Sequence, residues 1–272
     1  MFDMRGKNVV VTGGGRGIGR GITRAMVKAG AAVAIAGRSP EPLRATVEEM
    51  AGIGGRVIDV PTDITSAEAV DRLVARTLDD LGPIDCWVNN AGSARAEDNA
   101  PLLELTGSQW DAVVELNLKA TFFAAQTAAR TMTERGGSII NISSRSGSQP
   151  NPMTGQYGAA KAGIDNLTAT MAVEWGHLGI RVNAVAPGAV LTDEPAAALA
   201  TPNRRRRQAE TIPLRRLGTV DDIGPLCVFL ASDEASWLTG EVIQVTGGSR
   251  VPVGYLSYLH RINERLGWDD EA

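Results

Sequence analysis

The sequence predicts an α/β protein with a doubly wound parallel sheet in a single domain. Short apolar runs rich in β-branched residues alternate with longer helical segments, and a glycine-rich turn joins the first run to the first helix. Such alternation favours parallel strands with helices on both faces of the sheet. The seven expected strands are 8–11, 33–36, 57–60, 84–88, 138–142, 182–185 and 242–245. The expected helices are 20–29, 41–51, 67–81, 108–134, 156–175 and 220–230.

The glycine-rich turn spans residues 12–19 and contains Gly13, Gly17 and Gly19. Glycine allows positive φ and lets a pyrophosphate approach the backbone, while the following helix presents unpaired N–H groups to the phosphates. The spacing departs from the general G-x-G-x-x-G fingerprint. Taken alone, the turn therefore fits either a nucleotide site or a tight structural turn.

Composition is compatible with one large domain, residues 1–252, followed by an extension, residues 253–272. The 272 residues are 43% hydrophobic and 21% charged, and they contain no run of eighteen apolar residues that would span a membrane. A strand begins within the first eight residues, without the charged and apolar regions of a signal peptide, so we expect a cytoplasmic protein. A net charge of -4 gives no general attraction to nucleic acid.

The two cysteines, Cys86 and Cys227, both lie in apolar runs. We expect buried free thiols rather than a disulfide, which agrees with a reducing compartment. The only histidines, His177 and His260, have no carboxylate or cysteine cluster beside them, so we expect no metal site.

Tyr157 and Lys161 lie one helical turn apart, and Ser144 precedes Tyr157 by thirteen residues. The four-residue spacing places the phenol and the amine on one face of a helix. An ammonium about 5 Å away, at an effective dielectric of about 20, stabilises a phenolate by roughly 3 kcal/mol, or about two pKa units. Tyr157 could then act as a general acid or base. The alternative is an ordinary exposed pair on a helix.

An ordered set of motifs carries a resemblance to a known family. The set comprises Thr12-Gly13-x-x-x-Gly17-x-Gly19, Asn89-Asn90-Ala91-Gly92, Asn117, Ser144, Tyr157-x-x-x-Lys161 and Pro187-Gly188. From about residue 5 to about residue 250, the chain resembles the short-chain dehydrogenase/reductases. The resemblance implies a Rossmann-type, seven-stranded sheet in the order 3-2-1-4-5-6-7, with ligands at the carboxyl ends of the strands. It also implies a homotetramer built through the helices that contain Asn117 and Tyr157.

The same resemblance implies hydride transfer between a nicotinamide and a small carbonyl or alcohol substrate. Ser144 would bind the substrate oxygen, Lys161 would also bind the nicotinamide ribose, and Asn117 would support a water that relays protons to Lys161. Asp63 and Ile64 would lie at the adenine, and Val190 and Thr192 at the nicotinamide amide. The full set of expected cofactor positions is Gly13, Arg16, Gly17, Ile18, Gly19, Arg38, Ser39, Asp63, Ile64, Asn90, Ala91, Gly92, Tyr157, Lys161, Pro187, Gly188, Val190 and Thr192. Pro187 and Gly188 are expected mainly to shape their loop, and Asn89 either to line the site or to stabilise the sheet.

The second strand ends in Ala36-Gly37-Arg38-Ser39, where an NAD enzyme would place a carboxylate against the ribose 2′-hydroxyl. Arg38 could instead accept a 2′-phosphate, with Arg16 reaching the same group and Ser39 adding a hydrogen bond. NADP(H) is therefore expected in preference to NAD(H). Arg38 could also be a solvated residue that stacks on adenine, as in some NAD-dependent relatives.

Residues 193–213 correspond to a variable segment over the substrate site in the family. Four successive arginines, Arg204 to Arg207, are either a solvated surface or contain one or two ligands for the phosphates of a coenzyme A or carrier-protein thioester. Two substrate classes stay open: 3-oxoacyl thioesters, and bulky secondary alcohols of steroid or terpenoid type. A nucleotide-binding sensor or scaffold without turnover is the alternative of another class, and the complete catalytic set favours the enzyme.

The chain departs from the family at its end, where Thr246 replaces the common aspartate before Gly247-Gly248. About twenty further residues carry an apolar stripe at helical spacing: Tyr255, Leu256, Tyr258, Leu259, Ile262 and Leu266. This extension is expected to pack on its own domain or on a neighbouring subunit.

Overall fold

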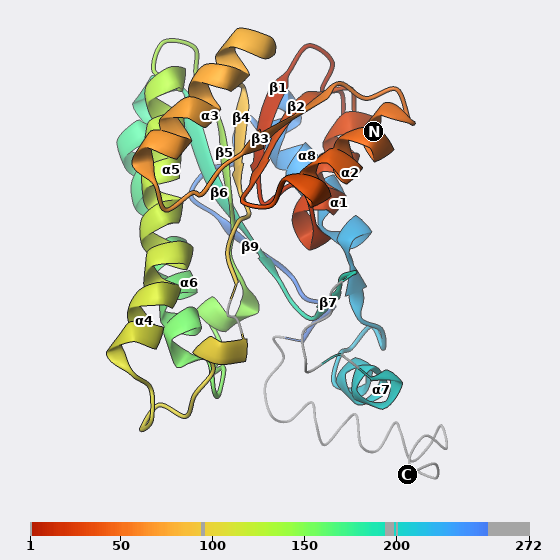
Figure 1. Cartoon of the computed structure of the whole chain (residues 1–272), viewed down its shortest axis with the longest axis vertical. Helices are drawn as coiled ribbons and strands as arrows, with labels where there is room; N and C mark the ends of the chain where they lie inside the picture. Colours follow the sequence, from red (N-terminus) through yellow and green to blue (C-terminus); the bar gives the residue numbers. More distant parts are fainter. Residues whose placement is uncertain (1, 94–95, 194–198, 200, 250–272) are drawn as a thin grey trace.

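A central sheet of seven parallel strands organises the chain in a computed structural model that describes residues 2–93, 96–193, 199 and 201–249 (Figure 1). The strand order is β3-β2-β1-β4-β5-β6-β9, which confirms the expected fold and the order 3-2-1-4-5-6-7. The strands are β1 Asn8–Thr12, β2 Ala32–Gly37, β3 Val57–Pro61, β4 Cys86–Asn89, β5 Gly137–Ile142, β6 Ile180–Pro187 and β9 Val242–Val245. Two further short strands, β7 Val190–Leu191 and β8 Gly218–Thr219, pair with each other.

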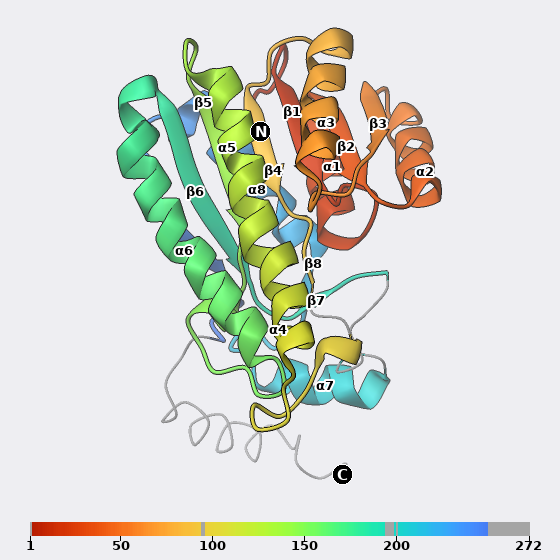
Figure 2. The same ribbon diagram turned by 60° about the vertical axis from the view of Figure 1, so that its left-hand side comes forward.

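Helices cover both faces of the sheet (Figures 1 and 2). They are α1 Gly17–Lys28, α2 Pro40–Ala51, α3 Ala67–Asp80, α4 Gly107–Val114, α5 Ala120–Met132, α6 Gly155–Trp175, α7 Pro202–Glu210 and α8 Gly224–Ala231. Short helical turns are η1 Ala96–Asp98, η2 Glu115–Lys119, η3 Arg145–Gly147, η4 Gly176–Leu178, η6 Val220–Asp222 and η7 Asp233–Ala235. α1, α2 and α8 contribute to one core, and α3, α5 and α6 to the other.

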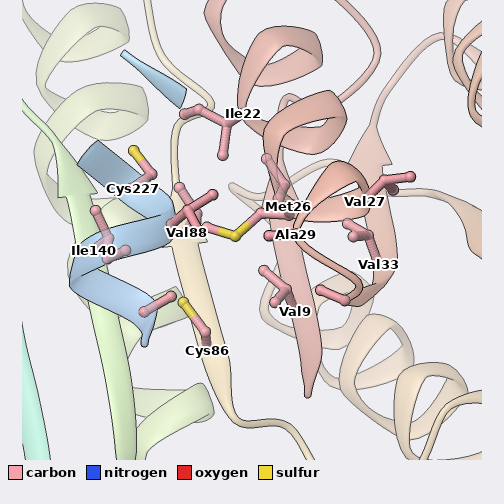
Figure 3. Close-up of a cluster of buried hydrophobic side chains, with 14 of the residues drawn as sticks. Val9, Ile22, Met26, Val27, Ala29, Val33, Cys86, Val88, Ile140 and Cys227 are labelled. Carbon is pink, nitrogen blue, oxygen red and sulfur yellow. The ribbon is translucent and has the colours of Figure 1, made fainter. Parts of the chain in front are cut away.

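Alternate residues of each strand feed these two cores because successive strand side chains point to opposite faces. Val9 and Val11 of β1 pack into the core under α1 and α8, whereas Val10 between them packs into the core under α3 and α5. Figure 3 shows part of the first core, where Cys86 and Cys227 approach the same cluster of side chains. Both cysteines are buried free thiols, as expected, and burial raises the pKa of both.

Some boundaries differ from those expected. The segment 108–134 is helical from Gly107 to Met132, but a five-residue π-helical turn, Glu115–Lys119, lies between α4 and α5. The last expected helix is shorter and begins at Gly224, after the 3₁₀ turn η6. No helix in the described ranges is long and apolar enough to cross a membrane.

The glycine-rich turn is held between β1, β2 and β4. Gly13 has φ 68° and Gly17 has φ 49°, a region that favours glycine. The Gly13 N–H donates to the carbonyl of Ala36 at 2.7 Å, so the turn folds back over the end of β2. Gly19 lies so close to the turn that a Cβ there would be 2.1 Å from the Gly13 carbonyl oxygen. The sequence spacing of the glycines is thus explained by a close backbone approach.

We predict that Gly19→Ala lowers the free energy of unfolding by about 2 kcal/mol, because the new Cβ must displace the Gly13 carbonyl. The same displacement should weaken nucleotide binding. Thermal unfolding and a fluorescence titration with NADPH measure the two effects. Gly107→Ala is the control, since a Cβ at Gly107 meets nothing within 4 Å. Equal behaviour of the two variants would contradict the prediction.

Candidate active site

Four candidate catalytic residues meet beyond the carboxyl end of β5, where open α/β sheets bind ligands. Ser144 follows β5 and caps the turn η3, while Tyr157 and Lys161 lie in the first two turns of α6. Asn117 lies in the π-helical turn between α4 and α5. Because α6 packs against both η3 and this turn, side chains far apart in the sequence converge on one region.

The Tyr157 phenol forms a hydrogen bond with Ser144, and its environment sets its acidity. Burial raises the pKa of Tyr157 above its usual value, and the hydrogen bond with Ser144 lowers it by less. The sequence predicts a lowered pKa from the effect of the Lys161 ammonium, and burial of the phenol acts in the opposite direction. The Lys161 ammonium nitrogen lies 5.6 Å from the centre of the Tyr157 ring.

Lys161 is buried, with 4% of its surface exposed. Its Nζ donates a hydrogen bond of 2.9 Å to the carbonyl of Ile142, the last residue of β5. Burial lowers the pKa of Lys161 to about 8, and the charge of Asp165 acts in the opposite direction. The ammonium is consequently charged at neutral pH, yet it loses its proton far more readily than a lysine in water.

Asn117 is fully buried, and its side-chain amide closes the π-helical turn. Its Nδ2 donates to the carbonyls of Ser93 at 2.9 Å and Val113 at 3.0 Å. Its Oδ1 is buried and accepts no hydrogen bond from the described residues. A Cβ on Gly92 would lie 2.6 Å from this Oδ1 and 3.5 Å from Lys161 Nζ, so both polar atoms border the same glycine. This arrangement suits a bridging water, which requires several polar partners.

The phosphate end of the site is the glycine-rich turn at the start of α1. Arg16 precedes α1, makes no side-chain cap and is exposed. Ile18 is half-buried and packs against the core, while Gly17 lies next to Thr192, whose Cγ2 would be 3.4 Å from a Cβ at Gly17. The turn and the segment after β7 therefore lie next to each other at the end of the sheet where open α/β proteins have their ligand crevice, with helix N–H groups available to an anion.

Asn90 and Ala91 fasten the turn to β4. The backbone N–H groups of Asn90 and Ala91 donate to Thr12 Oγ1 at 2.9 and 3.0 Å. Asn90 Nδ2 donates to the carbonyl of Thr12 at 2.9 Å. The Asn90 side chain thus fixes the shape of the turn, and Ala91 and Gly92 follow it directly after β4.

Arg38, Ser39, Asp63 and Ile64 gather beyond β2 and β3. Arg38 and Ser39 are exposed, and the Ser39 hydroxyl does not cap α2. Asp63 accepts hydrogen bonds from the N–H of Thr65 at 3.0 Å and from its hydroxyl at 2.8 Å. These bonds, with a smaller contribution from the Arg38 charge, lower the pKa of Asp63. Arg38 is therefore close enough to Asp63 for the two to define one polar end of the crevice, beside buried Ile64.

At the opposite end, Pro187 closes β6 and Gly188 allows close packing against β9. A Cβ on Gly188 would lie 2.9 Å from Thr246 Cα, and the Gly188 N–H donates to the Val245 carbonyl at 2.9 Å. Val190 belongs to the short strand β7, and Thr192 follows it. Pro187 and Gly188 thus shape the loop, while Val190 and Thr192 lie where the loop turns toward Gly17.

Sequence reasoning missed a chain of buried polar side chains behind the catalytic residues. Trp87 Nε1 donates to Asn89 Oδ1 at 2.7 Å, Asn89 Nδ2 to Asn141 Oδ1 at 3.0 Å, and Asn141 Nδ2 to Thr168 Oγ1 at 2.9 Å. This chain ties β4 and β5 to α6, so Asn89 stabilises the sheet. The signal in the sequence was an asparagine inside each of two apolar strands.

The arginine run occupies the middle of α7, beyond the same end of the sheet (Figure 1). Arg204, Arg206 and Arg207 are exposed, while Arg205 is half-buried and donates to the carbonyl of Leu199 at 2.8 Å. Beside the site, Gln149 Nε2 donates to the carbonyl of Ser249 at 3.4 Å. The apolar stripe from Tyr255 to Leu266 lies outside the described residues.

Comparison with known proteins agrees with this site. The family model for enoyl-(acyl carrier protein) reductase matches residues 13–250. The chain belongs to the short-chain dehydrogenase/reductase family, whose members are NAD(P)-dependent oxidoreductases acting on hydroxyl and carbonyl groups.

Relatives of the chain act on different substrates. A 3-oxoacyl-(acyl-carrier-protein) reductase of Thermotoga maritima is 37% identical over 90% of this chain and 98% of its own length. A 3beta-hydroxysteroid dehydrogenase of Eggerthella lenta is 36% identical over 93% of this chain and 97% of its own. A 7 alpha-hydroxysteroid dehydrogenase solved with NADH and 7-oxo glycochenodeoxycholic acid has a TM-score of 0.84 at 33% identity, covering 90% of this chain and 95% of that structure.

We predict that Asn117→Ala lowers kcat by about 100-fold, the lower end of a typical general acid–base contribution. The substitution removes the buried acceptor next to Lys161 without touching the Arg38 end of the crevice. The KM for the nucleotide should consequently change little. Steady-state kinetics at several pH values, with circular dichroism to verify folding, provide the test, and an unchanged kcat would exclude this role of Asn117.

Proposed function

We propose that the protein is an NADP(H)-dependent oxidoreductase that interconverts a ketone and a secondary alcohol, with Tyr157 as the general acid or base. The observation that carries this proposal is the grouping of Tyr157 with Ser144 and the buried Lys161, whose Nζ lies 5.6 Å from the centre of the Tyr157 ring. A sensor or scaffold has no need for a buried ammonium with a pKa near 8 next to a phenol. Perturbed acidity of this kind is typical of catalytic sites.

Each side chain then has a defined task. Ser144 donates a hydrogen bond to the substrate oxygen, and Tyr157 gives that oxygen a proton in reduction or takes one in oxidation. A bound nicotinamide supplies or accepts the hydride. The charge of Lys161 stabilises the phenolate, and Asn117 holds a water through which Lys161 exchanges protons with solvent. The raised pKa of Tyr157 keeps the phenol protonated at neutral pH, which favours reduction there.

The proposed preference for NADP(H) rests on the polar end of the crevice. Arg38 and Arg16 are both exposed, and the residues from Ala36 to Ser39 provide no carboxylate that would repel a 2′-phosphate. Gly13, Gly17 and Gly19 would receive the pyrophosphate at the start of α1. NAD(H) is the alternative, with Arg38 stacked on the adenine.

For the substrate, a 3-oxoacyl thioester is favoured by exposed arginines on α7, which offer partners for phosphate groups. Similarity to a 3-oxoacyl-(acyl-carrier-protein) reductase supports the same choice, whereas similarity to two hydroxysteroid dehydrogenases supports a bulky secondary alcohol. Both classes present a carbonyl or hydroxyl group to Ser144 and Tyr157.

We also propose that the protein is cytoplasmic and assembles as a homotetramer through the helices around α5 and α6. Phe123 of α5 is 49% exposed and Val173 of α6 is 82% exposed, which supports an interface there. The extension at residues 253–272 would pack on its own domain or on a neighbouring subunit.

The central prediction concerns turnover itself. NADPH oxidation in the presence of ketones and 3-oxoacyl thioesters should proceed for one substrate class. Tyr157→Phe should lower kcat by at least about 1,000-fold, because the phenol proton is lost while the ring packing is kept. Absorbance of the reduced nicotinamide follows both proteins. Activity retained in Tyr157→Phe would refute the proposed mechanism, and tight nucleotide binding without any turnover would favour a sensor.

The cofactor preference has its own test. Arg38→Ala should raise the KM for NADPH about tenfold or more and leave the KM for NADH nearly unchanged, because a charge-assisted hydrogen bond to phosphate contributes about 1.5–3 kcal/mol. Arg76→Ala is the matched control, since that exposed arginine pairs with Asp80 on α3. Equal effects on both nucleotides would show that Arg38 does not select the phosphate.

A further inference from the structure

Asp165 is an acidic residue of α6 that the catalytic set does not include. It lies one helical turn after Lys161 and two turns after Tyr157, on the same side of the helix. The residue is half-buried, and its Oδ1 is shielded from solvent. Asp165 thus places a partly buried carboxylate on the helix that carries Tyr157 and Lys161.

The carboxylate also borders the segment that carries Ser144. A Cβ on Gly147, the last residue of η3, would lie 2.6 Å from Asp165 Oδ2 and 3.1 Å from the carbonyl carbon of Lys161. Glycine at this position lets η3 approach the carboxylate and the backbone of α6. The Ser144 hydroxyl, at the other end of η3, accepts a hydrogen bond of 3.2 Å from the N–H of Ser146. Asp165 therefore lies where η3, which follows Ser144, approaches α6, which carries Tyr157.

Asp165 acts on Lys161 through its charge. Among the charged side chains of the described residues, Asp165 is the one whose charge raises the pKa of Lys161, whereas burial lowers that pKa. The other groups that surround Lys161 are neutral: the phenol of Tyr157, the amide of Asn117 and the carbonyl of Ile142. Charged or titratable groups on elements packed against α6 are Arg145 in η3, Asp111 in α4, the Glu115–Lys119 pair in η2, Arg130 and the adjoining Glu134 of α5, Arg181 in β6 and His177 in η4.

We propose that Asp165 is a positioning residue for the hydride-transfer reaction: its carboxylate keeps Lys161 charged and holds the Ser144 segment against α6. The inference rests on the proposed function, in which the Lys161 charge stabilises the Tyr157 phenolate. Asp165 acts through Lys161 and does not itself contact the substrate.

The size of the two electrostatic effects decides the direction of the expected change. Along the helix axis, Asp165 is about 6 Å from Lys161 and about 12 Å from Tyr157, at 1.5 Å per residue. A neutral residue at position 165 would directly favour the phenolate, but only weakly across the longer distance. Loss of the Lys161 charge acts on Tyr157 at close range and disfavours the phenolate more strongly. Removal of the Asp165 charge should therefore lower the pKa of Lys161, so that fewer molecules hold a charged Lys161 beside a Tyr157 phenolate at pH values near and above 8.

The test is the pH profile of alcohol oxidation with NADP⁺ for Asp165→Asn, which removes the charge and keeps the shape. The limb of kcat/KM that follows the Lys161 charge should move downward by about one pH unit, so the rate at pH 9 falls up to about tenfold. At pH values below the shifted limb, the rate should stay within about twofold of the wild-type rate. Asp165→Glu, which retains the charge, should keep the original profile even where kcat is reduced.

Glu174→Gln is the control, because it removes an acidic charge from the same helix about 20 Å along its axis from Lys161. Its profile should match the wild-type profile. Thermal unfolding verifies that each variant is folded, and Asp165→Ser provides a second neutral variant if Asp165→Asn does not fold.

An unshifted pH profile in the neutral variants would overturn the inference. This holds if the rate is unchanged, and it also holds if the rate is reduced equally at every pH, because a purely structural role of Asp165 predicts an equal reduction. Failure of the proposed function has a different signature. In that case the wild-type protein shows no turnover, or Tyr157→Phe retains it, before any variant of Asp165 is considered.

Discussion

The whole site depends on the way β1 and β4 lie side by side in the sheet. Thr12 at the end of β1 binds the backbone of Asn90 and Ala91 through its hydroxyl, and Asn90 returns a hydrogen bond to the Thr12 carbonyl. These bonds fix the glycine-rich turn next to the segment that contains Gly92. Because β2 and β4 flank β1 on opposite sides, the connections leave in opposite directions and the crevice opens between them. This junction between β1 and β4 therefore positions both the phosphate end and the proton-transfer end of the site.

A second constraint fixes α6 relative to the sheet. The buried side chains of Trp87, Asn89, Asn141 and Thr168 satisfy one another in series from β4 to α6. A buried polar group without a partner costs about 1–3 kcal/mol, so a shift of α6 along its axis would break the last bond and be disfavoured. Lys161 and Ile142 add a further tie between α6 and the next residue of β5. The position of Tyr157 follows from these bonds rather than from its own contacts.

The sequence predicted the sheet and its order because strand and helix periodicities, and the motif order, depend on local pattern. It did not predict the π-helical turn, since that turn depends on the Asn117 amide bonding to the carbonyls of Ser93 and Val113, one of them from a distant segment. The sequence also did not predict the raised pKa of Tyr157, because burial is a tertiary property and it outweighs the expected effect of Lys161. Nor did the sequence predict that the Asn90 side chain holds the turn through the Thr12 carbonyl. Pattern identifies which residues matter, and packing decides what each one touches.

Burial of the charged Lys161 side chain lowers the free energy of unfolding. Its pKa falls from the usual value of 10.5 to about 8 because the ammonium loses its hydration. Between these two values the unfolded chain binds more protons than the folded chain, so the contribution of Lys161 to the free energy of unfolding increases as the pH rises. Below pH 8 both states carry the charge, and the folded protein keeps the full cost of desolvating it. The protonated state that stabilises a phenolate is therefore the state that burial disfavours, and both the bond to the Ile142 carbonyl and the charge of Asp165 oppose that effect.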